Sequence, residues 1–386
     1  MYEKFVALCL NAGATASYLE NAKSGMAASQ MNITQEKLRA APIPICSTAE
    51  QHRIVAKVDE LMVLCDRLEA EQADAASAHA RLVETLLGTL TQSTDAADLA
   101  TNWQRLAEHF DTLFTTEASI DALKQTLLQL AVMGKLVPQK PDDEPASELL
   151  KRVAGERARL EAEGICKKFK AMPPVGDDER PFEVPEGWIW ERIGNYVIQT
   201  DYGLSEKTFA ATDGVPVLKM GDIQGGSVIL GGQKAVPPTT EGLPYLFLEP
   251  DDLLYNRTNS AELVGKTGIF RGAARQYSFA SYLIRIRCAS GMVSPTFLNF
   301  AMNAPMFRET EIVPHLKQQC GQANVNGTIL RNMRIPVPPA AEQHRIVAKV
   351  DELMALCDNL KADLATAHQR QGTLADTLIE SALDAA

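Results

Sequence analysis

The sequence of 386 residues lacks the features that mark membrane, secreted and metal-binding proteins. No apolar run approaches the roughly 18 residues that a membrane-spanning helix needs. The N-terminus has no basic start followed by an apolar stretch, so it does not resemble a signal peptide. Seven cysteines are scattered without a CxxC pair or zinc-ligand spacing. These absences predict a reduced, cytoplasmic protein with no metal site and no membrane contact.

Motifs of the common enzyme classes are also missing. The sequence has no GxxxxGK[ST] phosphate loop, no GxGxxG dinucleotide motif, no Asn-Pro-Pro-Tyr-like methyltransferase motif and no GxSxG nucleophile turn. We therefore predict no cofactor and no catalysis. A nuclease site made of acidic residues and lysine is too variable to be excluded in this way, so a stand-alone enzyme with an unrecognised site stays open as an alternative.

A long internal repeat is the main feature that the sequence does have. Residues 49–62 return unchanged as residues 341–354, at an offset of 292. Upstream, the likeness continues at the same offset without a gap, as Phe5 with Phe297, Asn11 with Asn303, Leu38 with Leu330 and Ile43-Pro44 with Ile335-Pro336. Such a period is that of a whole domain rather than of a solenoid. Residues 1–48 are therefore predicted to be the C-terminal remnant of a domain whose intact version spans 184–338.

The repeat leads into two helical segments. Apolar residues recur with 3-4 spacing through residues 49–91 and 339–386, which predicts helices of about 65 Å. Thr48 and Gln51 have the spacing of a capping box. A lone amphipathic helix of this length needs a partner, so we expect the two to pair as a coiled coil. Residues 49–163 form the first helical region, with further helices at 101–133 and 147–163, and residues 164–183 form a linker.

The region 184–338 has a different character. Short apolar runs alternate with Gly, Asn, Asp and Pro, which is typical of closely spaced strands, and residues 295–320 return to a helical pattern. The predicted fold is therefore α+β, with a β core in this domain and long helices outside it. The region contains 14 basic and 13 acidic residues, whereas the whole chain has a net charge of −11. A domain with a net charge near zero can still have one basic face.

Several short stretches carry a resemblance to a known family. They are AEQHRI at 341–346 with its upstream copy, LAVMGKLVPQ at 130–139, PEGWIW at 185–190, NRTNS at 256–260 and NVNG at 324–327. With the duplicated helical segment, the chain resembles the specificity (DNA-recognition) subunit of Type I restriction-modification systems. The resemblance covers nearly the whole sequence. Where a full member has a complete first target-recognition domain, this sequence has only residues 1–48.

The resemblance implies a function without bond chemistry. Family members bind double-stranded DNA through two target-recognition domains, and two helical spacers, paired as an antiparallel coiled coil, hold these domains apart. They dock methyltransferase subunits and, through them, the restriction motor subunit. A chain with one recognition domain would also be able to form a homodimer and restore two-fold symmetry. The alternative is a coiled-coil scaffold, or degenerate half-subunit, without sequence specificity of its own.

Candidate DNA contacts are polar side chains in loops and strands of 184–338. Arg and Lys suit guanine and phosphate, and Asn and Gln suit adenine. The candidates are Lys219, Asp222, Gln224, Asn256, Arg257, Asn259, Lys266, Arg271, Arg275, Arg285, Arg287, Gln322 and Asn324. The asparagines are equally typical of turns that bond their own backbone, and Arg285 and Arg287 would also suit a solvated strand face.

The start of each long helix supplies a second set of candidates. The resemblance and the repeat predict spacer or subunit contacts there, through Gln51, His52, Arg53, Gln343, His344 and Arg345. We expect the two histidines to make polar contacts rather than to act as catalytic bases.

Overall fold

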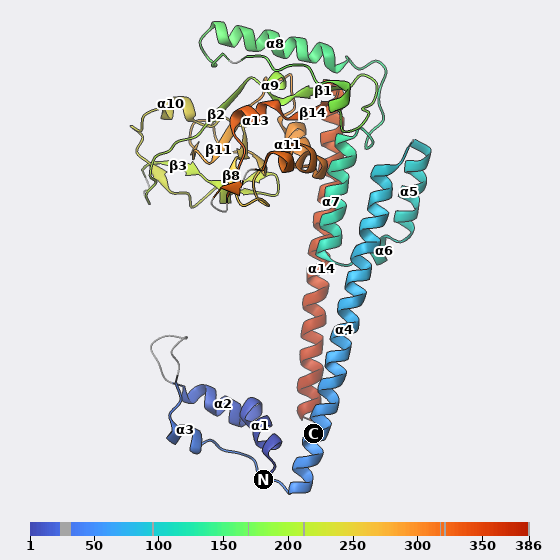
Figure 1. Ribbon diagram of the computed structural model, residues 1–386, viewed down its shortest axis with the longest axis vertical. Coiled ribbons are helices and arrows are strands. Elements are labelled where there is room, and N and C mark those ends of the chain that lie inside the picture. The colour runs from blue at the N-terminus through green and yellow to red at the C-terminus, as the bar shows by residue number, and fades with distance from the viewer. Residues whose placement is uncertain are drawn as a thin grey trace. The chain divides into compact units, whose positions relative to one another are not determined.

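The computed structural model describes residues 1–23, 32–94, 96–168, 170–210, 213–316, 318–319 and 322–384 (Figure 1). They form two compact units, Met1–Leu82 and Val83–Ala386, which are described separately. The predicted α+β class is confirmed, and strands β1 to β14 all belong to the second unit. None of the described helices combines the length and the apolar content that crossing a bilayer requires.

The first unit is helical. It contains α1 (Glu3–Asn11), α2 (Gly13–Ala22), α3 (Gln35–Arg39) and α4 (Thr48–Gln92) up to Leu82. Helix α4 confirms the predicted long helix to within one residue at each end. The predicted cap at Thr48 is wrong, because the hydroxyl of Ser47 accepts the hydrogen bond from the Glu50 backbone N–H at 3.2 Å. Gln51 instead turns inward and is buried.

The second unit begins with a helical section. It comprises the end of α4 from Val83, α5 (Ala96–Glu108), α6 (Phe110–Leu113), α7 (Glu117–Val132) and α8 (Ala146–Ala162). Val83 and Leu87 of α4 share one apolar cluster with Leu123 of α7 and Cys357 of α14 (Ala340–Asp384). Within this unit, the last turns of α4 run antiparallel to α14, and α7 packs along α14 (Figure 1). Apolar side chains at 3-4 spacing on each helix line the shared seam.

The β core is one six-stranded sheet with three small sheets around it. The large sheet has the order β2-β11-β7-β9-β5-β4. Its strands are β2 (Gln199–Tyr202), β4 (Ile223–Gln224), β5 (Ser227–Val228), β7 (Leu253–Asn256), β9 (Thr267–Ile269) and β11 (Leu283–Arg287). The small sheets combine β1 (Ile189–Arg192) with β14 (Arg334–Val337), β10 (Ser278–Phe279) with β3 (Val215–Leu218) and β6 (Ala235–Val236), and β12 (Gln318–Gln319) with β13 (Gln322–Asn324) and β8 (Thr258–Asn259). The strands predicted from apolar runs at 214–218, 252–255 and 282–287 agree with β3, β7 and β11 to within one residue at each end. The run at 228–230 shares only Val228 with β5, and Ile229 and Leu230 lie outside any strand.

Several helices lie around the strands of this domain. They are α9 (Ile193–Tyr196), α10 (Leu243–Leu246), α11 (Pro295–Asn303), α12 (Pro305–Phe307) and α13 (Gly327–Asn332), followed by α14. The repeat recurs in three dimensions, because α11, α13 and α14 begin 292 residues after α1, α3 and α4. Helices α4 and α14 have the same length of 45 residues. Equivalent sequences have therefore folded into equivalent elements in both units.

Candidate nucleic-acid interface

A small sheet of amide-bearing strands gathers several of the predicted contacts. In the sheet β12-β13-β8, Ala323 pairs with Asn259 and Asn324 pairs with Thr258, both antiparallel. The hydroxyl of Thr258 donates to Oδ1 of Asn324 at 3.1 Å, and Asn324 is exposed. Gln322 lies in β13, but its side chain is outside the described part of the structure. We call residues 258–259 and 322–324 the amide ribbon.

An arginine and a tyrosine stand beside the amide ribbon. Arg257 directly precedes β8, and its guanidinium carbon lies 5.0 Å from the ring centroid of Tyr202. Its Nη1 donates to the Ser281 carbonyl at 3.2 Å. The Tyr202 hydroxyl accepts a hydrogen bond from the Gly327 backbone N–H at 2.6 Å, so the ring is held at both ends. Tyr202 is nevertheless 47% exposed, and an arginine stacked on an anchored ring keeps a defined direction.

Two of the candidate asparagines act as turn formers. Asn256 is buried and donates from Nδ2 to the Leu263 carbonyl at 3.2 Å. Asn259 accepts the backbone N–H of Ser260 at 2.8 Å through its own side chain. Both bonds fix the turn that connects β7 to β9, which is the structural alternative that the sequence left open. Asn256 cannot reach a base edge from the core.

Arg285 and Arg287 do not form a solvated strand face. Arg285 is fully buried, with Nη2 2.8 Å from Oδ2 of Asp201 and Nη1 2.8 Å from the Phe247 carbonyl. The buried setting and the nearby Asp201 raise the pKa of the Tyr245 hydroxyl to about 12. Arg287 makes a bidentate ion pair with the buried Asp252, with Nε 2.7 Å from Oδ1 and Nη2 2.5 Å from Oδ2. Both arginines therefore hold the sheet to its surrounding loops.

A second group of candidates lies at the opposite edge of the large sheet from Tyr202. Lys219 and Asp222 flank a short 3-10 turn that leads into β4. Asp222 accepts the Lys219 backbone N–H at 2.6 Å and the Gln233 amide at 3.0 Å, so its carboxylate is used internally. Lys219 and Gln224 are exposed. The sheet order separates this turn from the Tyr202 strand by four intervening strands.

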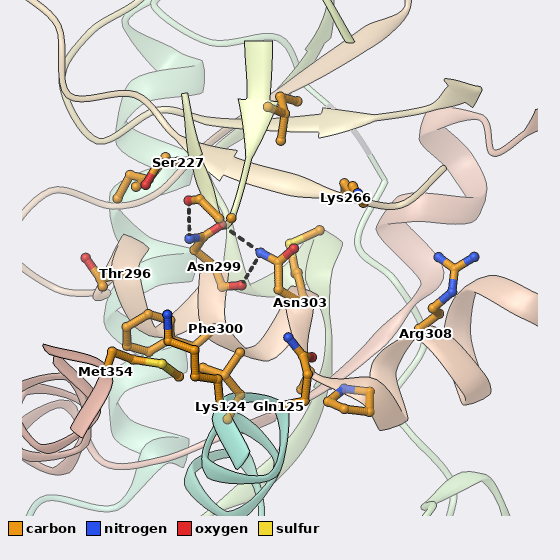
Figure 2. A pocket seen from close by; sticks show the side chains of 18 of the residues that line it. Lys124, Gln125, Ser227, Lys266, Thr296, Asn299, Phe300, Asn303, Arg308 and Met354 are labelled. Carbon is orange, nitrogen blue, oxygen red and sulfur yellow. Dashed lines mark hydrogen bonds between the residues drawn. The ribbon is translucent and has the colours of Figure 1, made fainter. Parts of the chain in front are cut away.

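Lys266 and Arg271 line a groove between the β domain and the helices (Figure 2). The groove has a volume of about 1040 Å³. Its basic residues are matched by acidic ones, namely Asp121, Glu262, Asp351 and Asp358. Arg271 pairs with Asp251 and donates to the Thr296 hydroxyl at 2.8 Å. Such a balanced lining does not favour phosphate.

Figure 2 shows what builds the groove wall. The side-chain amide of Asn299 donates to the Gly226 carbonyl at 2.7 Å, and that of Asn303 donates to the Asn299 carbonyl at 2.8 Å. The Asn303 amide also donates to the Thr267 carbonyl at 2.9 Å. These bonds tie α11 to β9 and to the β4–β5 turn. The last candidate, Arg275, is exposed and lies against the Phe247 ring at 5.1 Å, away from the groove lining.

The start of each long helix contains the same hydrogen-bond network. Nε2 of Gln51 donates to the Cys46 carbonyl at 2.9 Å, and Nε2 of Gln343 donates to the Pro338 carbonyl at 3.0 Å. Oε1 of Gln51 accepts the Tyr2 backbone N–H at 2.7 Å, and Oε1 of Gln343 accepts the Ser294 backbone N–H at 2.9 Å. The three pairs of equivalent positions, Gln51 with Gln343, Cys46 with Pro338 and Tyr2 with Ser294, all differ by 292. Both glutamines therefore fasten the helix start to its own preceding segment.

Of the other predicted residues at the helix starts, His52, Arg53 and His344 are exposed and Arg345 is half-buried. His52 is exposed and stacks on the Tyr2 ring at 3.9 Å, and His344 is exposed as well. Arg53 pairs with Glu50, whereas Arg345 reaches across to Asp143 with Nη2 2.5 Å from Oδ2. These groups remain predicted contacts.

Comparison with known proteins decides the family. A family model described as "Type I restriction modification DNA specificity domain" matches residues 257–367. Two curated Escherichia coli proteins, the EcoEI and EcoAI Type I restriction enzyme specificity subunits, are each 39% identical over 373 residues. The alignments cover 95% of this chain and 63% of each relative. The chain belongs to the family of Type I specificity subunits.

A solved structure from a study of complex assembly and conformational transition in a Type I restriction-modification system has a similar fold. It matches with a TM-score of 0.51 and 17% identity, over 96% of this chain and 68% of that chain. The specificity-domain match begins at Arg257 and runs through the amide ribbon into α14. The chain spans 63% of the length of the two curated relatives.

The sequence did not single out every residue of this interface. Tyr202 was not a candidate, because its exposure and its contacts with Arg257 and Gly327 arise only when β2 meets α13. Glu342 was also missed. It is buried between Trp188, whose Nε1 donates at 3.0 Å, and Gln139, and burial raises the pKa of its carboxyl above the usual range.

Proposed function

We propose that this chain is a sequence-specific DNA-binding subunit of a Type I restriction-modification complex and carries out no bond chemistry itself. The observation that carries the proposal is the stacking of Arg257 on the anchored Tyr202, beside the amide ribbon. Arg257 and the amide ribbon both lie inside the region that matches the specificity domain. Arginine reads guanine with two parallel hydrogen bonds, and amide side chains read adenine. The amide ribbon consists of two short antiparallel strands with polar side chains, and a two-stranded β-ribbon fits the major groove.

The exposed basic candidates complete this proposed interface in a different role. Lys219 and Arg275 are exposed and carry positive charge, Lys219 beside the Thr208 hydroxyl and Arg275 against the Phe247 ring. Such side chains supply phosphate contacts, which set register and depend on salt rather than on sequence. Asn256, Asp222, Arg285 and Arg287 are left out of the proposed interface, because their polar atoms are engaged inside the protein.

The proposal is tested by selecting bound sequences from a randomised duplex library with the full chain and its methyltransferase partner. We expect the selection to enrich one motif. Salt should weaken the affinity for every duplex, but it should weaken the affinity for this motif less steeply than binding by charge alone would predict. Equal affinity for all duplexes would favour the alternative function, a coiled-coil scaffold without sequence specificity. Turnover of DNA by the chain alone, with S-adenosylmethionine or magnesium, would contradict the non-catalytic assignment.

A specific observation supports a docking role for the helices as well. An apolar cavity of about 490 Å³ opens between α5, α6, α7 and α14, lined by Trp103, Leu106, Phe110, Leu356 and Leu360. Leu356 is 57% exposed, which is typical of an interface residue rather than of a core residue. We propose that this cavity receives a methyltransferase subunit, through which the motor subunit is reached.

Docking is tested with Leu356→Glu, which places a charge in the cavity without disturbing a buried residue. We expect the variant to lose co-purification with the methyltransferase subunit and to keep its thermal midpoint. The matched control is Leu230→Glu, an exposed leucine of the β domain. Gel filtration of the purified complex also decides whether two copies of this chain are present, as a symmetric homodimer would require.

A further inference from the structure

The two most exposed tyrosines of the chain lie at the same arginine. Of the eight tyrosines, Tyr282 and Tyr202 have the largest exposed fractions, 49% and 47%. Tyr202 carries the stacked guanidinium of Arg257, and its hydroxyl is bonded to the Gly327 backbone. Aromatic rings that stay open to solvent in one place are typical of a binding surface, because each ring gains free energy when a ligand covers it.

Strand pairing places Tyr282 beside Arg257. The ladder between β7 and β11 joins Asn256 to Leu283, so the next residues, Arg257 and Tyr282, lie opposite each other. The Arg257 backbone N–H donates to the Tyr282 carbonyl at 3.0 Å. Opposite residues of an antiparallel pair project from the same face of the sheet. The side chains of Arg257 and Tyr282 therefore share one face.

Tyr202 belongs to that face as well. It pairs with Ile284 of β11, which is two residues from Tyr282, and two residues are the side-chain repeat of a strand. The neighbouring strands β2, β11 and β7 thus bring Tyr202, Tyr282 and Arg257 together at one end of the sheet. The Arg257 carbonyl also accepts the Val325 backbone N–H at 2.9 Å. The group therefore has a defined position before any ligand binds.

The ring of Tyr282 suits a base feature that an arginine does not read. An arginine bonded to guanine leaves the next base pair to the side chain that lies beside it. In the major groove, the methyl group of thymine is the apolar feature that a ring can cover. Adenine and cytosine present amino groups there, which would lose their hydrogen bonds to water under a ring.

We propose that Tyr282 is a specificity-determining residue that reads a thymine methyl group at the base pair next to the guanine bound by Arg257. This inference rests on the proposed DNA-binding function and adds to it one base and the residue that reads it. Tyr282 covers the methyl group, while Tyr202 holds the arginine in register. Removing one covered methyl group corresponds to a roughly fourfold loss of affinity.

The test removes the methyl group from the DNA and the ring from the protein, separately and together. The full chain with its methyltransferase partner binds the selected duplex, in which each thymine of the motif is replaced in turn by deoxyuridine. At one thymine next to a guanine, we expect a roughly fourfold loss for the original chain and for Tyr282→Phe, which keeps the ring, and no loss for Tyr282→Ala. The ratio is taken within each variant, so a change in the folded fraction cancels.

Phe209→Ala is the matched control, because it removes another aromatic ring of the β domain that is 42% exposed. It should keep the fourfold loss. A selected motif without thymine next to guanine overturns the inference and leaves the proposed function standing. The same holds if deoxyuridine has no effect on the original chain, or has an equal effect on Tyr282→Ala. A selection that enriches no motif overturns the proposed function and this inference together.

Discussion

Replacing Arg257 by lysine is the most direct test of how this chain would read DNA. The substitution keeps the positive charge and deletes the planar fork that can reach two acceptors of one guanine. A bidentate arginine contributes about 1–3 kcal/mol of discrimination, which corresponds to a roughly 5- to 150-fold loss of affinity for the preferred sequence. The anchored Tyr202 ring orients the guanidinium before binding, so we expect a value in the upper half of this range.

The assay is fluorescence anisotropy with the selected duplex and with a scrambled duplex, at several salt concentrations. Arg257→Lys should weaken binding to the selected duplex, relax the preference at one base pair, and leave both the scrambled affinity and the salt slope unchanged. Arg257→Ala should weaken binding to the selected duplex further and still leave the salt slope unchanged, because a base contact neutralises no phosphate. Arg180→Lys is the matched control, because Arg180 lies outside the β domain and pairs with Asp177.

Two results would refute the reasoning. Full selectivity of Arg257→Lys would show that Arg257 does not read a base. A uniform loss for all duplexes would show a phosphate contact instead. A separate urea titration guards against a folding effect, since the bond from Arg257 to the Ser281 carbonyl contributes about 0.5–1.5 kcal/mol to stability.

Three further predictions concern stability, measured by urea unfolding. Arg285→Met should cost about 3–5 kcal/mol, because it leaves Asp201 charged and buried without its guanidinium; a neutral outcome would contradict the structural role. Burial raises the pKa of Glu342, so its folded form holds a proton more firmly than the unfolded form does, and the wild-type chain should lose more stability than Glu342→Gln as pH rises from about 4.5 to 7; parallel pH profiles would argue against this. Gly134→Ala should cost about 1–3 kcal/mol, because the residue has a φ of 71° and a Cβ would lie 2.5 Å from a proline ring, whereas Gly155→Ala in α8, with open space around it, should stabilise by about 0.5–1 kcal/mol.

The long helices and the repeat were the parts most accessible to sequence reasoning. A 3-4 apolar spacing over 45 residues specifies a helix whatever surrounds it, and the predicted ends agree with α4 and α14 closely. Strands β3, β7 and β11 were also recognisable, since each is an apolar run between turn residues. The cap of α4 was predicted at the wrong residue, because Ser47 and Thr48 are both good caps and only the backbone path chooses between them.

The candidate interface was predicted less well, for a physical reason. Residue type gives hydrogen-bonding capacity but not the partner that uses it. Arg257 and Arg285 look alike in the sequence, yet one stacks on an exposed tyrosine and the other lies in the core against Asp201. Their partners, Tyr202 and Asp201, are adjacent residues at the end of β2, and antiparallel pairing with β11 decides which arginine meets which.

The sequence by itself determined the duplicated plan of this protein, its two 45-residue helices and its family, because these depend on local periodicity and on identity between distant segments. Only the tertiary structure decided which of the candidate polar side chains are exposed and which hold the fold. It also decided that equivalent residues of the two repeat copies differ in burial. Val337 lies under a neighbouring strand and Ile45 is open, since burial is a property of what packs on a residue and not of the residue.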